Sequence, residues 1–172
     1  MKLYHGSTQI VDKPLVSVGR SNLDFGKGFY ATDLQTQAEK WISRFVSLGK
    51  KSFVNIYNFD NQNIDTKCKY KKFLDYNEEW LDFIINCRSG KNDYLNFDII
   101  EGGIANDRVF NTIELYFSNL IDKNTTLNRL KYEKPNNQIC FINQSVMDDV
   151  LHFEAYYEIG EKLWQQIKHC CK

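Results

Sequence analysis

The chain has 172 residues, 42% of them hydrophobic and 15% aromatic, which is enough for one domain with a buried core and short for two. Lysine plus arginine and aspartate plus glutamate each number 22, so no net charge directs the protein toward nucleic acid. No apolar run approaches the roughly 18 to 20 residues that span a bilayer, and the first residues contain no apolar leader. The sequence therefore excludes a transmembrane helix. The cysteines number five, an odd count that does not suggest a set of disulfides, and this favours the reducing cytoplasm.

The first half of the chain predicts an α-helix followed by a β-strand. Residues 32–35, Thr-Asp-Leu-Gln, are a capping-box pattern, after which apolar residues recur at helical spacing until Gly49 provides a stop. On this helix Trp41 falls on the face that is expected to pack inward. Residues 52–59 are rich in β-branched and aromatic side chains, which is typical of a strand in a sheet.

The middle of the chain continues this alternation of helices and strands. Residues 75–87 fit a helix, and residues 97–100 fit a short buried strand that ends at Gly102 and Gly103. Asp107 can cap a further helix. The apolar residues that would form one face of that helix are Val109, Phe110, Ile113, Tyr116, Phe117 and Leu120.

The last third of the chain predicts one more helix, two strands and a helical tail. The small helix is expected at residues 125–130, the strands at 137–142 and 152–159, and the tail at 160–172. No internal repeat, low-complexity stretch or linker divides the chain. We therefore expect a single α+β domain over residues 1–172.

Two short motifs near the N-terminus carry the strongest functional signal. The first is Leu-Tyr-His-Gly-Ser at residues 3–7, and the second is Phe-Gly-Lys-Gly-Phe-Tyr at residues 25–30, running on to Trp41. A histidine and then a glycine-bracketed aromatic loop that opens a helix suit a shallow cleft for an aromatic heterocycle and a ribose. Each aromatic residue alone is more often a core residue than a ligand wall, so it is the joint order of the motifs that predicts a nucleotide site.

These motifs resemble the nicotinamide-ribose site of diphtheria-toxin-like and poly(ADP-ribose)-polymerase-like ADP-ribosyltransferases. Residues 98–108 and 136–141 also look like a family of small bacterial proteins of largely unknown function, commonly regarded as members of that superfamily. This similarity covers most of residues 1–153. The resemblance implies a split antiparallel β-sheet flanked by helices, with NAD as the co-substrate.

The resemblance implies a role for each matching residue. His5 would hydrogen-bond a ribose hydroxyl of NAD, and the main-chain N–H and C=O of Gly6 would pair with the nicotinamide carboxamide. Tyr30 and Trp41 would flank the nicotinamide ring. The further NAD contacts are expected from Ser7, Lys27 and Gly28.

The third motif departs from the family pattern. Transferases of this type usually carry a glutamate on a strand at the position of Gln138, and that carboxylate stabilises positive charge on the ribose. A glutamine keeps the hydrogen bond but cannot act as a general base. The expected catalytic residues are therefore His5, Tyr30 and Gln138, with Glu101 and Glu154 as alternative sources of the carboxylate.

Other charged or metal-binding residue types give weaker signals. Arg20, Lys27 and Arg108 are candidates for the NAD pyrophosphate; Arg20 and Lys27 are equally ordinary surface charges, and a residue in the position of Arg108 is more often one. The local basic patch could contact a nucleic acid, although four lysines on a loop are more often simply solvated. Its members are Lys67, Lys69, Lys71 and Lys72. The tail at residues 169–171, His-Cys-Cys, lacks zinc-ligand spacing, so no metal is expected.

The combined reading predicts an enzyme that uses NAD. We expect it to mono-ADP-ribosylate a macromolecular acceptor, a protein rather than a nucleic acid, and to release nicotinamide. The resemblance further implies a toxin with an antitoxin partner, and no membrane partner is expected. The alternative, motivated by Gln138, is a catalytically silent module that binds NAD or ADP-ribose.

Overall fold

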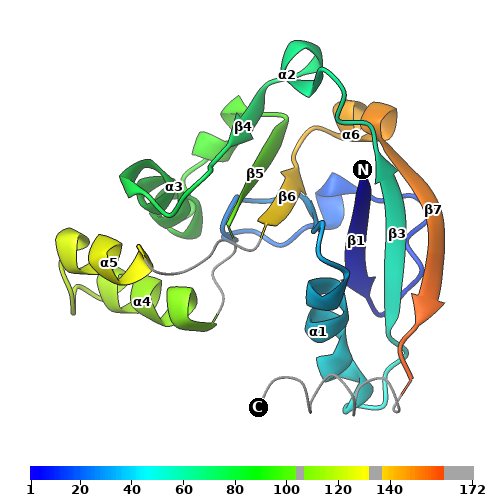
Figure 1. The fold of residues 1–172 in the computed structure, drawn as a ribbon, viewed down its shortest axis with the longest axis horizontal. Coiled ribbons are helices and arrows are strands. Elements are labelled where there is room, and N and C mark those ends of the chain that lie inside the picture. Colours follow the sequence, from blue (N-terminus) through cyan, green and yellow to red (C-terminus); the bar gives the residue numbers. More distant parts are fainter. Residues whose placement is uncertain (104–106, 132–136, 161–172) are drawn as a thin grey trace. The chain divides into compact units, whose positions relative to one another are not determined.

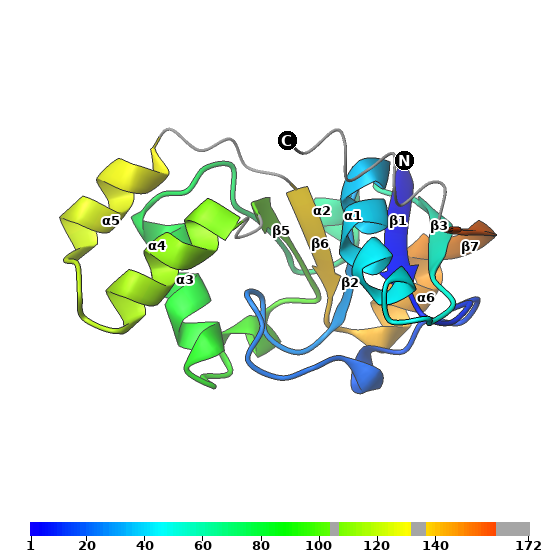
Figure 2. The same cartoon turned by 90° about the horizontal axis from the view of Figure 1, so that it is seen from below.

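The structure of the protein is a computed structural model that describes residues 1–103, 107–131 and 137–160 (Figures 1 and 2). Within it the chain forms two compact units, each assembled from separate stretches of sequence. The first unit contains residues 1–14, 31–62 and 147 onward, and the second contains residues 15–30 and 63–146. The predicted helical tail at 160–172 lies outside the described residues but for Gly160, and the single domain over residues 1–172 stays a prediction.

The first unit is built on a three-stranded antiparallel sheet. The strands lie in the order β1, β3, β7, so that β1 and β7 both pair with β3 (Figure 1). Their bounds are Lys2–Ser7 for β1, Phe53–Phe59 for β3 and Leu151–Glu158 for β7. The predicted strands at 52–59 and 152–159 are confirmed, whereas the sequence pattern did not predict β1.

Helix α1 (Gln35–Val46) packs on one face of this sheet. It buries Ala38 and Ile42 beside Val54 of β3. The Tyr157 hydroxyl of β7 donates a hydrogen bond of 2.5 Å to the Glu39 carboxylate, which ties the helix to the far strand. Burial, followed by this hydrogen bond, raises the pKa of Tyr157, so its hydroxyl keeps the proton that it donates. The predicted helix is therefore confirmed.

Two details of α1 differ from the prediction. Its N-cap residue is Leu34, which provides no side-chain cap, and Thr32 Oγ1 accepts a hydrogen bond from the Leu34 N–H at 3.1 Å instead of closing a capping box. Trp41 is 52% exposed, so it does not pack inward. The buried face is centred on Ala38 and Ile42, and each residue is rotated about 100° from the one before it, which turns Trp41 away from the sheet.

The second unit contains a four-stranded mixed sheet in the order β2, β6, β5, β4. Strands β5 and β6 are antiparallel, but β4 and β5 are parallel, so the expectation of an antiparallel sheet is wrong for this pair. The strand bounds are Phe29–Ala31 for β2, whose last residue belongs to the first unit, Tyr70–Lys72 for β4, Ile99–Gly103 for β5 and Asn137–Phe141 for β6. The two glycines predicted to end β5 lie inside it, because β6 pairs with them.

Helices α3, α4 and α5 lie together on one side of this sheet (Figure 2). Their shared core includes Trp80, Ile84, Ile100, Val109, Ile113, Leu130 and Cys140, all at most 1% exposed. The helices predicted at 75–87, from 107 and at 125–130 are confirmed. The helix bounds are Ile64–Lys67 for α2, Glu78–Arg88 for α3, Asp107–Phe117 for α4, Lys123–Leu130 for α5 and Gln144–Val150 for α6, with short 3-10 helices at Val16–Val18 and Asp93–Asn96.

Helix α4 does not have the single apolar face that its sequence predicts. Val109 and Ile113 are fully buried, whereas Phe110 is 44% exposed and Phe117 is 47% exposed. The helix thus buries one apolar stripe and presents a second, aromatic one. Within the part of the chain that the structure describes, no helix is both long enough and apolar enough to cross a membrane.

Candidate functional site

The structure divides the predicted site residues between the two units. The first unit contains His5, Gly6, Ser7 and Trp41, and the second contains Lys27, Gly28, Tyr30 and Gln138. Within the first unit, Gly6 lies against Ala38 and Ile42, which flank Trp41 on α1. Within the second unit, Gly28 and Tyr30 lie against β6, the strand that carries Gln138.

Gly6 lies on the open edge of β1. Tyr4 exchanges two main-chain hydrogen bonds with Thr32 across this edge, with N···O distances of 2.8 and 3.0 Å. Because the main-chain groups of alternate residues in a strand point to the same side, the N–H and C=O of Gly6 point to this edge as well. Neither group has a hydrogen-bond partner among the described residues. Gly6 therefore offers one donor and one acceptor side by side.

Helix α1 covers one face of Gly6. A Cβ atom at this position would lie 2.7 Å from the Ala38 carbonyl oxygen and 2.9 Å from Ile42 Cβ. Both distances are below those of real Cβ contacts, and both atoms are fixed to the helix backbone. The packing of α1 on β1 thus requires a glycine at position 6, independently of any ligand.

His5 projects from the face of the sheet opposite α1, because successive side chains of a strand alternate between its faces. On this face the buried Asn55 holds the segment that follows β1. Its Oδ1 accepts a hydrogen bond of 2.8 Å from the Val11 N–H, and its Nδ2 donates to the carbonyls of His5 and Gln9 at 3.3 Å each. Sequence reasoning missed Asn55, although an amide inside an apolar strand was a usable signal.

Ser7 and Trp41, the other two predicted residues of the first unit, differ in how much of each side chain a ligand could contact. The Ser7 hydroxyl accepts a hydrogen bond of 3.2 Å from the Gln9 N–H, so it already stabilises the turn after β1. Trp41 is half exposed, and the Arg44 guanidinium lies 3.4 Å from its ring centroid. A cation therefore covers one face of this indole, and a stacked ligand would use the other face.

Packing within the second unit accounts for the glycines of the second motif. Gly26 has a φ of 77°, and a Cβ there would clash with the ring of Tyr94. A Cβ at Gly28 would lie 2.4 Å from the Phe141 carbonyl oxygen of β6. These glycines let the loop approach other atoms of the protein closely. The sequence alone had attributed this close approach to a bound ligand. Lys27 between them is partly exposed.

Tyr30 uses its hydroxyl inside the second unit. The hydroxyl donates a hydrogen bond of 2.6 Å to the Gly26 carbonyl and accepts one of 3.1 Å from the Phe25 N–H. Its ring packs against the core cluster that contains Cys140. Burial is the main reason that the pKa of Tyr30 lies far above its usual value. Tyr30 therefore fixes the loop of the second motif, and its phenol stays protonated.

Gln138 and Glu101 lie on opposite faces of the mixed sheet. Gln138 is the cross-strand partner of Gly102, and Glu101 is the partner of Ile139, so their side chains alternate. Gln138 shares its face with Cys140, which Tyr30 contacts. The Gln138 Nε2 is buried and has no hydrogen-bond partner among the described residues. A buried amide donor of this kind is suited to an acceptor oxygen supplied by a ligand.

Glu101 is an internal carboxylate of strand β5. It is 5% exposed, and its oxygens accept hydrogen bonds from the Tyr70 hydroxyl and, at 3.0 Å, from Asn137 Nδ2. The Lys72 ammonium lies 2.8 Å from the same carboxylate. These three partners satisfy and neutralise the charge inside the sheet. The sequence predicts that residues 101–103, Glu-Gly-Gly, form a loop after the strand at 97–100, and this prediction is wrong because β5 continues through Gly103.

The remaining charged candidates are surface or paired groups. The basic patch is not a loop, because Lys71 and Lys72 lie on β4, where they pair with Glu79 and Glu101. Glu154 is exposed, and its carboxylate lies 2.9 Å from the Lys2 ammonium. The pyrophosphate candidates Arg20 and Arg108 are both exposed.

The protein is thus a mixed α+β protein with an antiparallel sheet and a mixed sheet. A family model described as "Protein of unknown function (DUF3990)" matches residues 1–153, and the chain belongs to this family. The description of the family assigns no activity. Searches of the curated proteins and of the solved structures found no match.

Proposed function

We propose that the protein is an NAD-dependent ADP-ribosyltransferase that transfers one ADP-ribose unit to a macromolecular acceptor and releases nicotinamide. The observation that carries this proposal is the open edge of β1 at Gly6, where an N–H and a C=O face outward with no hydrogen-bond partner in the part of the chain that the structure describes. A primary carboxamide has one acceptor oxygen and two N–H donors. Nicotinamide can therefore form two hydrogen bonds with this single residue.

Two side chains of the first unit complete the proposed nicotinamide end. Trp41 stands one helical turn beyond Ala38, the residue that contacts Gly6, and it exposes half of its surface. Stacking of the nicotinamide ring on its indole would contribute roughly 0.5–1.5 kcal/mol beyond the buried area. His5, the residue before Gly6 on β1, would hydrogen-bond a ribose hydroxyl of NAD. Ser7, Lys27 and Gly28 are assigned to NAD binding by the resemblance of the motifs alone.

The resemblance of the motifs also assigns Gln138 and Tyr30 to the reaction. In the transfer, the bond between the ribose C1′ and the nicotinamide nitrogen breaks, and nicotinamide leaves with the bonding electrons. The acceptor nucleophile forms the new bond to C1′ and loses its proton. The orphan Nε2 of Gln138 is suited to donate to a ribose oxygen, but its neutral amide does not stabilise the positive ribose as a carboxylate would. The acceptor must therefore be a good nucleophile or bring its own base.

A catalytically silent module that binds NAD or ADP-ribose is the second candidate function. The observation that favours it is that both carboxylates proposed as alternatives to Gln138 already have partners within the protein. The Glu101 carboxylate accepts hydrogen bonds from Tyr70 and Asn137 and pairs with the Lys72 ammonium. Glu154 pairs with a surface lysine. Binding then needs only the hydrogen-bonding groups and the exposed indole, without chemistry at the ribose.

The choice of acceptor and partner is also part of the proposal. A protein acceptor is favoured over nucleic acid, since two of the four lysines in the basic patch are neutralised by glutamates. A toxin role with a neutralising antitoxin follows from the resemblance alone. Co-expression with its genomic neighbours, followed by pull-down, would test that partner.

The test is to incubate the purified protein with NAD and measure free nicotinamide by mass spectrometry, with and without cell lysate as a source of acceptors. The His5→Ala variant should lose the release, while His152→Ala, at an exposed histidine of β7, should retain it. Release that depends on lysate identifies transfer rather than hydrolysis. NAD binding without release would establish the silent module, and no NAD binding at all would overturn both candidates.

A further inference from the structure

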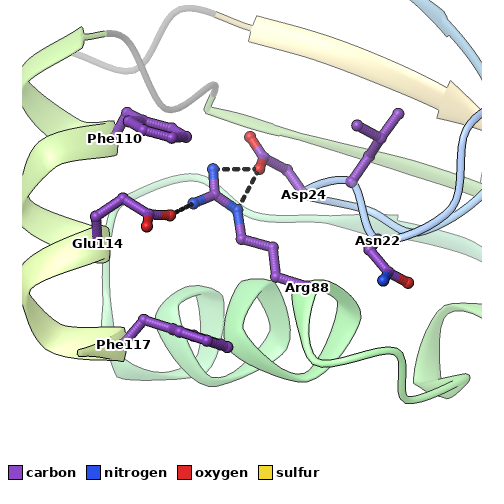
Figure 3. A pocket seen from close by; sticks show the side chains of 7 residues that line it. Asn22, Asp24, Arg88, Phe110, Glu114 and Phe117 are labelled. Carbon is purple, nitrogen blue, oxygen red and sulfur yellow. Dashed lines mark hydrogen bonds and ion pairs between the residues drawn. The ribbon is translucent and has the colours of Figure 1, made fainter. Parts of the chain in front are cut away.

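A pocket of about 320 Å³ opens on the surface of the second unit (Figure 3). Three parts of this unit form it: the loop before β2, the end of α3, and the exposed stripe of α4. Its lining residues are Asn22, Leu23, Asp24, Arg88, Phe110, Glu114 and Phe117. None of them has a part in the proposed binding of NAD.

The aromatic stripe of α4 forms the walls of this pocket. Phe110, Glu114 and Phe117 are spaced i, i+4 and i+7, so they lie on one face of the helix, with the carboxylate between the two rings. Figure 3 shows the three side chains projecting from α4 on the same side. Val109 and Ile113 of α4 belong to the core of the unit, whereas this second stripe lies outside that core. Exposed apolar side chains grouped around a hollow are typical of an interaction site.

The base of the pocket carries a net negative charge. The Arg88 Nε and Nη2 donate to a single oxygen of Asp24, Oδ1, at 2.9 and 2.7 Å, and the Arg88 Nη1 donates to Glu114 Oε1 at 3.2 Å. One guanidinium thus faces two carboxylates. The second oxygen of each carboxylate, Asp24 Oδ2 and Glu114 Oε2, has no hydrogen-bond donor among the described residues. Two acceptors with one uncompensated charge remain for a ligand.

We propose that this pocket receives an arginine side chain from a basic segment of a partner protein. A guanidinium supplies five N–H donors, which matches the two open carboxylate oxygens, and its positive charge cancels the excess negative charge. Its planar faces stack on aromatic rings, as Arg88 already does with Phe110 at 4.9 Å from the ring centroid. The pocket volume suits one long side chain, and the exposed rims of Phe110 and Phe117 then contact the chain that carries it.

The proposal is tested with a blocked peptide, acetyl-Leu-Arg-Leu-amide, titrated against the full chain and followed by NMR. A second peptide carries citrulline, the neutral isostere of arginine, in place of the arginine. We expect saturable shifts at Phe110 and Phe117 with the arginine peptide, and binding at least about tenfold weaker with citrulline. Equal binding of the two peptides, or no saturable binding of either, would overturn the proposal. Binding of ethylguanidinium as tight as that of the peptide would also overturn the proposal, because the pocket would then be a site for small cations rather than for a partner protein.

Matched variants assign the binding to the pocket. Glu114→Gln should weaken the arginine peptide about tenfold, because it removes the uncompensated charge from a half-exposed side chain with little effect on folding. Glu158→Gln, an exposed glutamate of the first unit, should leave the affinity unchanged. Phe117→Ala should weaken binding severalfold through the lost stacking surface. Undiminished binding by Glu114→Gln would refute the assignment. None of these measurements requires NAD, so their outcome is independent of the proposed transferase activity.

Discussion

The contact between α1 and β1 makes Gly6→Ala the most direct test of how the first unit is packed. The new methyl group would lie 2.7 Å from the Ala38 carbonyl oxygen and 2.9 Å from Ile42 Cβ. Carbon atoms in favourable contact are about 3.5–4.0 Å apart, so the helix must move by roughly 0.6 Å or more. Overpacking of this kind costs about 1–3 kcal/mol, and the lower backbone entropy of the unfolded alanine chain offsets about 0.4–1 kcal/mol. The expected net loss is about 1–2 kcal/mol in the free energy of unfolding.

Urea denaturation followed by circular dichroism would measure this loss. The control is Gly160→Ala, where a Cβ would meet no atom of the described residues within 4 Å and the change should stay within about 0.5 kcal/mol. If Gly6→Ala were as stable as the wild type while Gly160→Ala behaved as expected, the close approach of α1 to β1 would be refuted. The comparison also matters for function, because any loss of NAD binding by a Gly6 variant must be corrected for this loss of stability.

Four further outcomes are expected. Arg88→Met should destabilise the protein by about 2 kcal/mol in urea denaturation, because it leaves the Asp24 carboxylate, only 14% exposed, without its counter-ion. Asp122→Ala should lower the melting temperature at pH 7. Hydrogen bonds from the first turn of α5 lower the folded pKa of this carboxyl, so the wild-type advantage should be lost as the pH falls through that lowered pKa. Cys87, whose pKa burial raises to about 12, should resist iodoacetamide at pH 8 until the chain is unfolded, as peptide mass mapping would show. Gln138→Glu should increase nicotinamide release if the transferase proposal holds, and an unchanged rate would contradict the role given to this residue.

Local composition predicted most of the secondary structure because the elements concerned have a strong periodic signal. Residues 53–59 form a strand where β-branched and aromatic residues are dense, and the strand at 99–103 begins with two isoleucines. Strand β4, Tyr70–Lys72, was beyond this reasoning, because it is short, carries two lysines and exists through its pairing with β5. Apolar spacing also cannot tell an inward aromatic stripe from an outward one, which is why α4 and Trp41 differ from the prediction.

The candidate site was less predictable because glycine has two unrelated uses. A motif of glycines indicates a close approach of the backbone to something, and sequence alone does not say to what. At Gly28 the neighbour is the Phe141 carbonyl of β6. At Gly6 one face is covered by α1, while the polar edge of the same residue stays open. Gly6 is thus the one of these two glycines that packing requires and that also has main-chain groups available to a ligand.

The alternation of side chains along β5 and β6 constrains the chemistry that the proposed transferase can perform. Glu101 and Gln138 lie on opposite faces of one sheet, so a ribose that accepts a hydrogen bond from Gln138 is not in reach of the Glu101 carboxylate. Glu101 is moreover held by three polar neighbours, which favours a structural charge over a catalytic one. The face that carries Gln138 also carries Cys140 and contacts Tyr30, and both of these side chains are kept protonated by burial. The residues gathered at the third motif therefore supply hydrogen bonds and no negative charge. An acceptor that is itself a strong nucleophile, or one that brings a base, is the partner that this arrangement requires.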